Sequence, residues 1–108
     1  MVAGGMRLAL GARGYLVRDV PDYFEALAEI NDFRPDLVIL DEARCLVDAC
    51  QACSELYRLL RVPVILVGYH FSGEAWARAV AAGADFYLTP PYSYRELTAR
   101  VKAILRRY

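Results

Sequence analysis

Two continuous apolar runs constrain the fold of this chain most strongly. Residues 37–40 read Leu-Val-Ile-Leu and residues 64–67 read Val-Ile-Leu-Val, and both runs are rich in β-branched residues. A strand that is apolar at every position is buried on both faces, as strands are in a parallel sheet covered by helices. Residues 15–20 and 85–88 are predicted as two further strands, the first of them less buried. The chain is therefore expected to form an open α/β sheet.

Helical spacing of apolar residues separates these predicted strands. Pro21 and Asp22 mark a helix start, and the residue before Pro35 marks its end. Ser72 and Gly83 are predicted to begin and end another helix, and residues 93–96 have the pattern of a capping box. The predicted apolar faces of the four helices are Tyr23, Leu27 and Ile30; Leu46, Cys50, Cys53, Leu56 and Leu60; Trp76, Ala79 and Val80; and Leu97, Val101, Ile104, Leu105 and Tyr108.

Length and charge bound the class of protein. The 108 residues are expected to form one domain spanning residues 1–108, and 57% of them are hydrophobic while 24% are charged. Lys and Arg number 13, as do Asp and Glu, so the zero net charge does not favour nucleic acid or an anionic membrane as a direct partner. No apolar run reaches the length of a bilayer span, and the first residues lack a signal-peptide pattern. A cytoplasmic location is expected.

Three cysteines lie close together in the sequence. Cys45, Cys50 and Cys53 are interpreted as reduced thiols on a half-buried helix, because their odd number does not suit a disulfide framework. The alternative is a zinc site that adds His70, but the spacing of the cysteines fits no standard zinc-finger pattern.

Four segments in combination carry a resemblance to a known family. They are Gly-Tyr-Leu-Val at 14–17, Arg-Pro-Asp-Leu-Val-Ile-Leu-Asp at 34–41, Val-Pro-Val-Ile-Leu-Val at 62–67, and residues 82–97, which include Ala-Gly-Ala-Asp and Thr-Pro-Pro-Tyr. From residue 14 to residue 108 the chain resembles the receiver domain of two-component response regulators. The resemblance implies a flavodoxin-like (CheY-like) fold with strand order 2-1-3-4-5 and helices on both faces. It also implies a signalling role, not that of an enzyme, with a histidine kinase or an output or transcription protein as possible partner.

The same resemblance assigns the site residues. Asp41 matches the aspartate that accepts the phosphoryl group, and Tyr87 matches the aromatic residue that reports phosphorylation. Gly68 stands where receivers have a Ser or Thr, and Pro90 stands where they have a Lys. Pro91 is the family's own proline, which usually follows a cis peptide bond, so a cis Pro90–Pro91 bond is expected.

The metal-binding acidic pair is also expected to be absent. In receivers two acidic residues upstream of the Gly-Tyr strand help to hold Mg²⁺, but residues 1–13 contain no Asp or Glu. No cofactor is therefore expected. Because phosphoryl transfer depends on positioning and charge neutralisation, we interpret the chain as an atypical receiver (a pseudo-receiver) that acts by protein–protein interaction without normal phosphorylation.

Two alternatives remain open for the function. One is a phosphoacceptor with an unusual site made of Asp41, Glu42 and Asp48. The other is a small-ligand sensor with a pocket at the carboxyl ends of the strands, where open α/β sheets bind ligands. That pocket would be lined by Gly68, Tyr69, His70, Pro90 and Tyr92.

The short segment 1–13 is atypical for the family. Residues 7–13 resemble the end of the first receiver helix, in which case the first strand is missing; alternatively residues 6–10 form a short strand that replaces it. The helix is favoured. An incomplete sheet edge invites association, so a homodimer is predicted, formed by segment exchange or through the fourth helix, fifth strand and fifth helix. The charged residues of that second surface are Arg95, Arg100, Lys102, Arg106 and Arg107.

Overall fold

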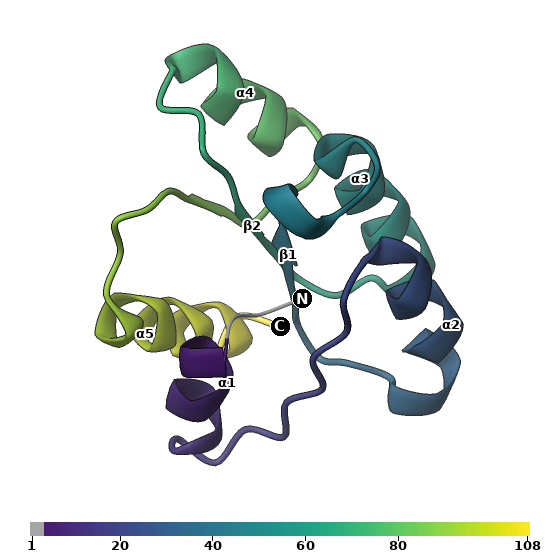
Figure 1. Ribbon diagram of the computed structural model, residues 1–108, viewed down its shortest axis with the longest axis vertical. Helices are drawn as coiled ribbons and strands as arrows, with labels where there is room; N and C mark the ends of the chain where they lie inside the picture. The colour runs from purple at the N-terminus through teal and green to yellow at the C-terminus, as the bar shows by residue number, and fades with distance from the viewer. Residues whose placement is uncertain (1–3) are drawn as a thin grey trace.

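A three-stranded parallel sheet forms the centre of the molecule. The computed structural model describes residues 4–108. Strands β1 (Val38–Asp41), β2 (Val64–Val67) and β3 (Phe86–Leu88) lie side by side in that order. Figure 1 shows the helices arranged around this centre. The register places Val38 beside Val64 and Ile65 beside Phe86. The two apolar runs of the sequence thus form β1 and the central strand β2, whose four residues are all buried.

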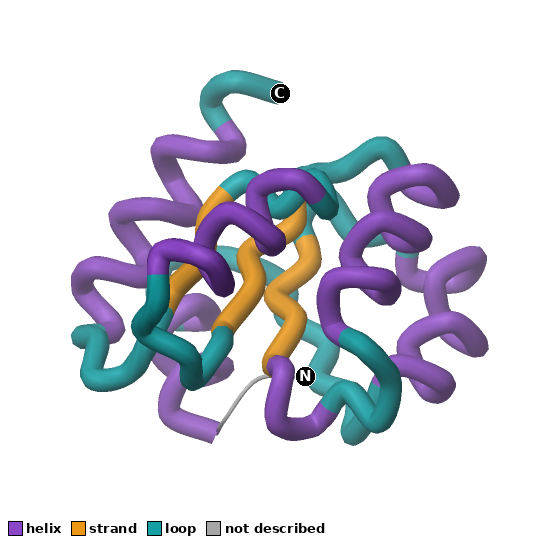
Figure 2. The backbone as a smooth tube through the Cα atoms, turned by 90° about the horizontal axis from the view of Figure 1, so that it is seen from above, coloured by secondary structure: helices purple, strands orange, loops and turns teal. Residues whose placement is uncertain are grey.

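Helices cover both faces of this sheet. Because side chains alternate across a strand, Leu40 and Leu66 pack with one group of helices while Ile39 and Ile65 pack with the other. The first group is α2 (Tyr23–Phe33), α3 (Ala49–Leu60) and α4 (Gly73–Ala81). The second is α1 (Gly4–Gly11) and α5 (Tyr94–Leu105), and a 3-10 turn, η1 (Glu42–Arg44), follows β1. Figure 2 shows the strands between the helices.

The helix starts predicted from the sequence are confirmed. The side chains of Asp22, Ser72 and Ser93 each accept a hydrogen bond from the backbone N–H three residues later. Each bond satisfies a donor that the first turn of a helix leaves unpaired. Gly83 follows α4 with a φ of 98°, a conformation that is costly for other residues.

The prediction of a strand at residues 15–20 is wrong. This segment has no regular structure, and within residues 4–108 no backbone hydrogen bond joins it to β1. A strand needs a neighbour for its ladder, and in the expected order that neighbour would be a first strand, which residues 4–108 do not contain. Within residues 4–108 the sheet therefore contains three of the four predicted strands. The segment from Gly4 to Gly11 is a helix, so the choice of a helix over a strand at the N-terminus is confirmed.

Four residues predicted on apolar helix faces are largely exposed. Leu46 has a φ of 68° and lies before α3, which begins only at Ala49 after its cap, Asp48. Trp76 and Val80 flank the buried Ala79 on α4, where the small alanine lets the helix approach the sheet while its larger neighbours face outward. Tyr108 lies beyond the end of α5, and its hydroxyl donates to Asp85 at 2.9 Å.

Candidate functional site

The predicted site residues meet at one end of the sheet, where the three strands terminate. Asp41 is the last residue of β1, Gly68 follows β2 directly, and Pro90 and Pro91 follow β3. The carboxyl ends of the parallel strands lie at the same end of the sheet, so these positions come together although they are far apart in the sequence. The Pro90–Pro91 peptide bond is cis.

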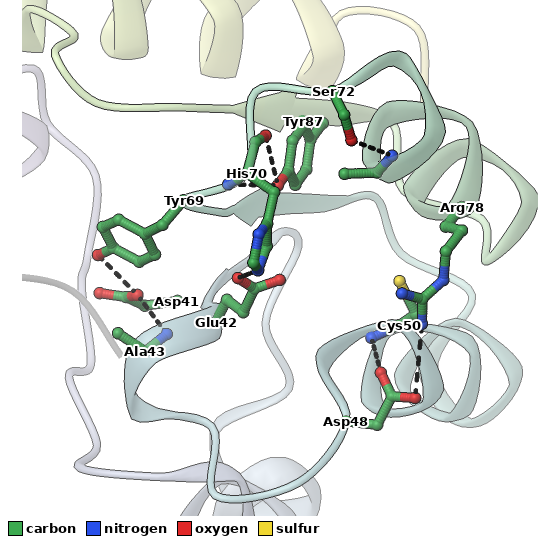
Figure 3. Close-up of polar contacts among 11 residues, drawn as sticks. Asp41, Glu42, Ala43, Asp48, Cys50, Tyr69, His70, Ser72, Arg78 and Tyr87 are labelled. Atoms are coloured by element: carbon green, nitrogen blue, oxygen red, sulfur yellow. Dashed lines mark hydrogen bonds and ion pairs between the residues drawn. The ribbon is translucent and has the colours of Figure 1, made fainter.

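The carboxylate of Asp41 is held by two donors. Its Oδ1 accepts a hydrogen bond from the backbone N–H of Ala43 at 3.0 Å, which caps η1. The same oxygen accepts a second bond from the hydroxyl of Tyr69, also at 3.0 Å. Burial, followed by the bond to Asp41, raises the pKa of Tyr69 above its ordinary value, so the phenol stays protonated and donates at neutral pH. Figure 3 shows the Tyr69 ring reaching over to Asp41.

Tyr87 fills the space beside Gly68. A Cβ atom added to Gly68 would overlap the hydroxyl and the ring of Tyr87. The Tyr87 side chain is only 6% exposed, and its hydroxyl donates to the carbonyl of His70 at 3.2 Å and accepts from the His70 N–H at 3.4 Å. The glycine at position 68 is therefore what permits this buried position of the tyrosine ring.

The other carboxylates near Asp41 are directed elsewhere. Glu42 Oε1 lies 3.3 Å from His70 Nε2. Asp48 accepts from the N–H of Cys50 at 3.0 Å as the cap of α3, and its other oxygen is 3.9 Å from Arg78. Residues 4–108 hold no cluster of three His, Cys, Asp or Glu side chains placed to share a metal ion. Since Mg²⁺ needs several oxygen ligands in octahedral geometry, these residues do not fit the Mg²⁺ site that the fold implies.

The cysteines do not form a zinc site with His70. Cys45 and Cys53 are fully buried in the core between the sheet and α2, α3 and α4, whereas His70 is exposed and faces Glu42. Burial raises the pKa of all three thiols, and that of Cys53 to about 11. Protonated thiols in an apolar core are packing residues, as the sequence had suggested.

The best-formed cavity given by the structure lies away from the residues that were predicted to line a ligand pocket. A cavity of about 310 Å³ runs beside β1 and residues 15–20, and Gly68, Tyr69, His70, Pro90 and Tyr92 do not line it. Sequence reasoning also missed the bond between Tyr69 and Asp41. The sequence signal for this bond was Tyr69, a large aromatic residue with a hydroxyl, directly after Gly68 at the end of a strand. Receivers normally carry the hydroxyl of a Ser or Thr at the position of Gly68.

Comparison with known proteins identifies the family. Residues 1–102 match the family model described as the response regulator receiver domain. The chain belongs to this family. Receiver domains are signalling modules of two-component systems and are not enzymes, so the class implied by the sequence motifs is confirmed.

Curated relatives are transcriptional regulators. The chain is 37% identical over 95 residues to the alkaline phosphatase synthesis transcriptional regulatory protein PhoP of Bacillus subtilis, covering 87% of this chain and 40% of that protein. It is 32% identical over 102 residues to the transcriptional regulatory protein CseB of Streptomyces coelicolor, covering 94% and 44%. The chain thus spans less than half the length of these relatives.

Solved structures show the same fold. A two-component response regulator from Clostridium difficile superposes with a TM-score of 0.88 at 26% identity, covering 95% of this chain and 85% of that one. A putative response regulator from Chloroflexus aurantiacus gives a TM-score of 0.85 at 31% identity, covering 95% of this chain and 87% of that one.

Among residues 4–108, every helix is too short or too polar to cross a membrane.

Proposed function

We propose that this chain is an atypical receiver, a pseudo-receiver, that signals by protein–protein contact without normal aspartyl phosphorylation. The observation that carries the proposal is the filled site. Tyr87 occupies the space beside Gly68, and Tyr69 donates to the carboxylate of Asp41. A phosphoryl group on Oδ1 would have to displace the Tyr69 hydroxyl, and a phosphoryl group on either oxygen would find Pro90 where receivers have a lysine to neutralise its charge.

The missing electrostatic stabilisation explains why this arrangement disfavours phosphoryl transfer. Catalysis of this reaction rests on positioning and on charge neutralisation by a metal ion and cationic groups. Glu42 and Asp48 are paired with His70 and Arg78, so they do not supply the carboxylates of a metal site. Residues 4–108 thus keep the receiver scaffold around Asp41 without a cluster of side chains placed to share a metal ion.

We propose that the chain passes on its signal by binding to a second copy of itself or to another protein. Exposed apolar and cationic side chains occur on α4, β3 and α5: Trp76 is about half exposed, and the Arg100 guanidinium lies 4.3 Å from the centre of the Phe86 ring. We expect a homodimer that forms either through this surface or through the edge of the sheet at β1, the side of β1 that faces away from β2. A histidine kinase or a transcription protein is the second class of partner, since the relatives are transcriptional regulators.

A second candidate function is that of a phosphoacceptor at Asp41. It is favoured by one observation: within residues 4–108, only Oδ1 of Asp41 is hydrogen-bonded, while Oδ2 is left for another partner.

Sedimentation velocity over a range of concentrations separates the two functions. The chain is measured with and without Mg²⁺ and acetyl phosphate, together with Asp41→Asn and a matched charge control, Asp36→Asn, at an exposed position just before the same strand. We expect self-association that the phosphodonor changes by less than twofold in all three proteins. Association that rises with the phosphodonor, and is lost only in Asp41→Asn, would replace this proposal with the phosphoacceptor.

A further inference from the structure

Positive charge is concentrated on the side of the sheet that α1 and α5 cover. Residues 4–17 and 89–108, which contain these two helices, hold seven of the 13 Lys and Arg residues but only one of the 13 acidic residues, Glu96. Residues 18–88 hold the other six cations and twelve acidic residues. The zero net charge therefore comes from two oppositely charged parts, and the α1–α5 side attracts anions. Its cations are Arg7, Arg13, Arg95, Arg100, Lys102, Arg106 and Arg107.

Two of these cations line a small cavity beside α5. Its volume is about 190 Å³, and its lining residues are Arg13, Tyr15, Thr98 and Lys102. The cavity lies where the chain leaves α1, which packs beside α5 (Figure 1). On α5, Lys102 follows Thr98 by four residues, so the two side chains share one face of the helix.

The turn after α1 places Arg13 at the cavity without using its side chain. The backbone N–H groups of residues 12–15 donate to carbonyls in the last turn of α1 at 2.9–3.3 Å. These carbonyls would otherwise be available to a cation at the end of the helix. Gly14 has a φ of 90°, which glycine adopts at little cost, and it turns the chain towards Tyr15. The Arg13 guanidinium is therefore available for another partner.

The two cations at the cavity are not neutralised within residues 4–108. Neither Arg13 nor Lys102 forms an ion pair there, and no acidic side chain lines the cavity. Thr98 is 3% exposed, and its hydroxyl donates to the carbonyl of Arg95 at 3.1 Å. Arg13, Lys102 and Tyr15 are thus the lining side chains with donors for a ligand. Because like charges at one cavity repel each other, a bound anion would stabilise this arrangement.

We propose that this cavity binds the dianionic phosphate group of a phosphate monoester. Two cations match the charge of such a group, which is about −1.5 to −2 at pH 7, better than the single charge of a carboxylate. The planar guanidinium of Arg13 suits two parallel hydrogen bonds to phosphate oxygens, and Lys102 adds a point charge. The volume equals that of about six liquid water molecules at ~30 Å³ each, so part of the ester fits as well. The site would give the chain an input that does not involve Asp41.

The test titrates the isotopically labelled 108-residue chain with glycerol 3-phosphate while amide chemical shifts are recorded. Sodium chloride is reduced in step, so that the ionic strength stays at about 0.15 M, where the screening length is about 8 Å. General attraction to the charged side then contributes little. We expect saturable shifts centred on residues 13–15, 98 and 102. Acetate, with one charge, should bind at least about fivefold more weakly.

Three exposed residues provide the variants and their control. Arg13→Gln and Lys102→Gln should each weaken binding at least about fivefold, because each removes a charge-assisted hydrogen bond. Arg100→Gln removes the same charge from the same helix. The Arg100 guanidinium lies 4.3 Å from the centre of the Phe86 ring and does not line the cavity, so this change should alter binding less than twofold. Circular dichroism verifies that all three variants are folded.

Vesicles of phosphatidylcholine with phosphatidic acid carry the same phosphate monoester on a lipid surface. Cosedimentation that falls at least about fivefold in Arg13→Gln, without binding of glycerol 3-phosphate, would assign the group to a lipid headgroup. Binding of glycerol 3-phosphate would assign it to a soluble ester.

Four results would overturn the proposal. These are no binding of either form of the ester, equal binding of acetate, an effect of Arg100→Gln as large as that of Lys102→Gln, and shifts centred on Asp41 and Gly68 instead of Arg13. The third would mean that only the overall charge matters, and the fourth would place the phosphate at the carboxyl ends of the strands. None of these measurements depends on phosphoryl transfer to Asp41, so the proposal can fail independently of the function proposed above.

Discussion

Substitution of Gly68 tests the account of the filled site directly. In Gly68→Ala the new Cβ overlaps the phenol of Tyr87, so the buried ring has to leave its position. The two hydrogen bonds to His70 are then lost, at roughly 0.5–1.5 kcal/mol each. Forcing extra atoms into a packed core typically adds about 1–3 kcal/mol. Because the weaker bond is long and the loop can relax, we expect a total loss of about 2–4 kcal/mol in the free energy of unfolding.

Urea unfolding followed by circular dichroism measures this loss. The matched control is Gly73→Ala in the first turn of α4, where an added Cβ meets nothing within 4 Å. That change should be neutral or should stabilise by up to about 1 kcal/mol, because alanine is the better helix former. A second background, Tyr87→Ala, removes the ring that causes the overlap. There Gly68→Ala should cost less than about 0.5 kcal/mol, which gives a coupling of about 2 kcal/mol. A cost that is the same in both backgrounds, or below 0.5 kcal/mol in the wild type, would refute the reasoning.

Three further predictions concern stability. Asp22→Ala removes the cap of α2 and should lower the free energy of unfolding by about 1 kcal/mol in urea titrations, with Asp32→Ala, exposed near the end of that helix, as control. Tyr23→Phe removes the 2.6 Å bond to Glu55 and should cost about 1–3 kcal/mol by thermal or urea unfolding, because the acceptor is a carboxylate. Burial raises the pKa of Cys53 from 9.0 to about 11, so its contribution is present below pH 9 and is lost as the pH rises towards 11. Unfolding free energies measured from pH 8 to 11 should therefore fall less steeply in Cys53→Ala, and equal slopes would contradict this.

The sequence was most informative where local chemistry alone decides the structure. The apolar runs at β1 and β2 are rich in β-branched residues and are buried between helices on both faces of the sheet, as expected for strands of a parallel sheet. The caps at Ser72 and Ser93 depend only on a side-chain oxygen and a backbone N–H three residues away. These features were predicted correctly because they do not depend on distant parts of the chain.

Features that depend on a neighbour were predicted less well. Residues 15–20 have a strand-like pattern but no adjacent strand within the described chain to pair with. Leu46 has helical spacing to Cys50, but Asp48 begins the helix only afterwards. The contact between Tyr69 and Asp41 joins residues 28 positions apart and depends on the geometry of two strand ends. The resemblance to receiver domains predicted Asp41 and Gly68 as site positions. The way in which Tyr69 and Tyr87 fill the site depends on the folded structure and could not be predicted from the sequence.

Intact-mass analysis tests the central claim most directly. The chain, Asp41→Asn and Asp36→Asn are incubated with Mg²⁺ and acetyl phosphate, and the mass of each is recorded over time. The account predicts no added phosphoryl group on any of them, because Tyr69 holds the carboxylate of Asp41 and, within residues 4–108, no cluster of side chains is placed to hold a metal ion beside it. A gain of one phosphoryl group by the wild type and by Asp36→Asn, absent from Asp41→Asn, would contradict the account and make this an active receiver.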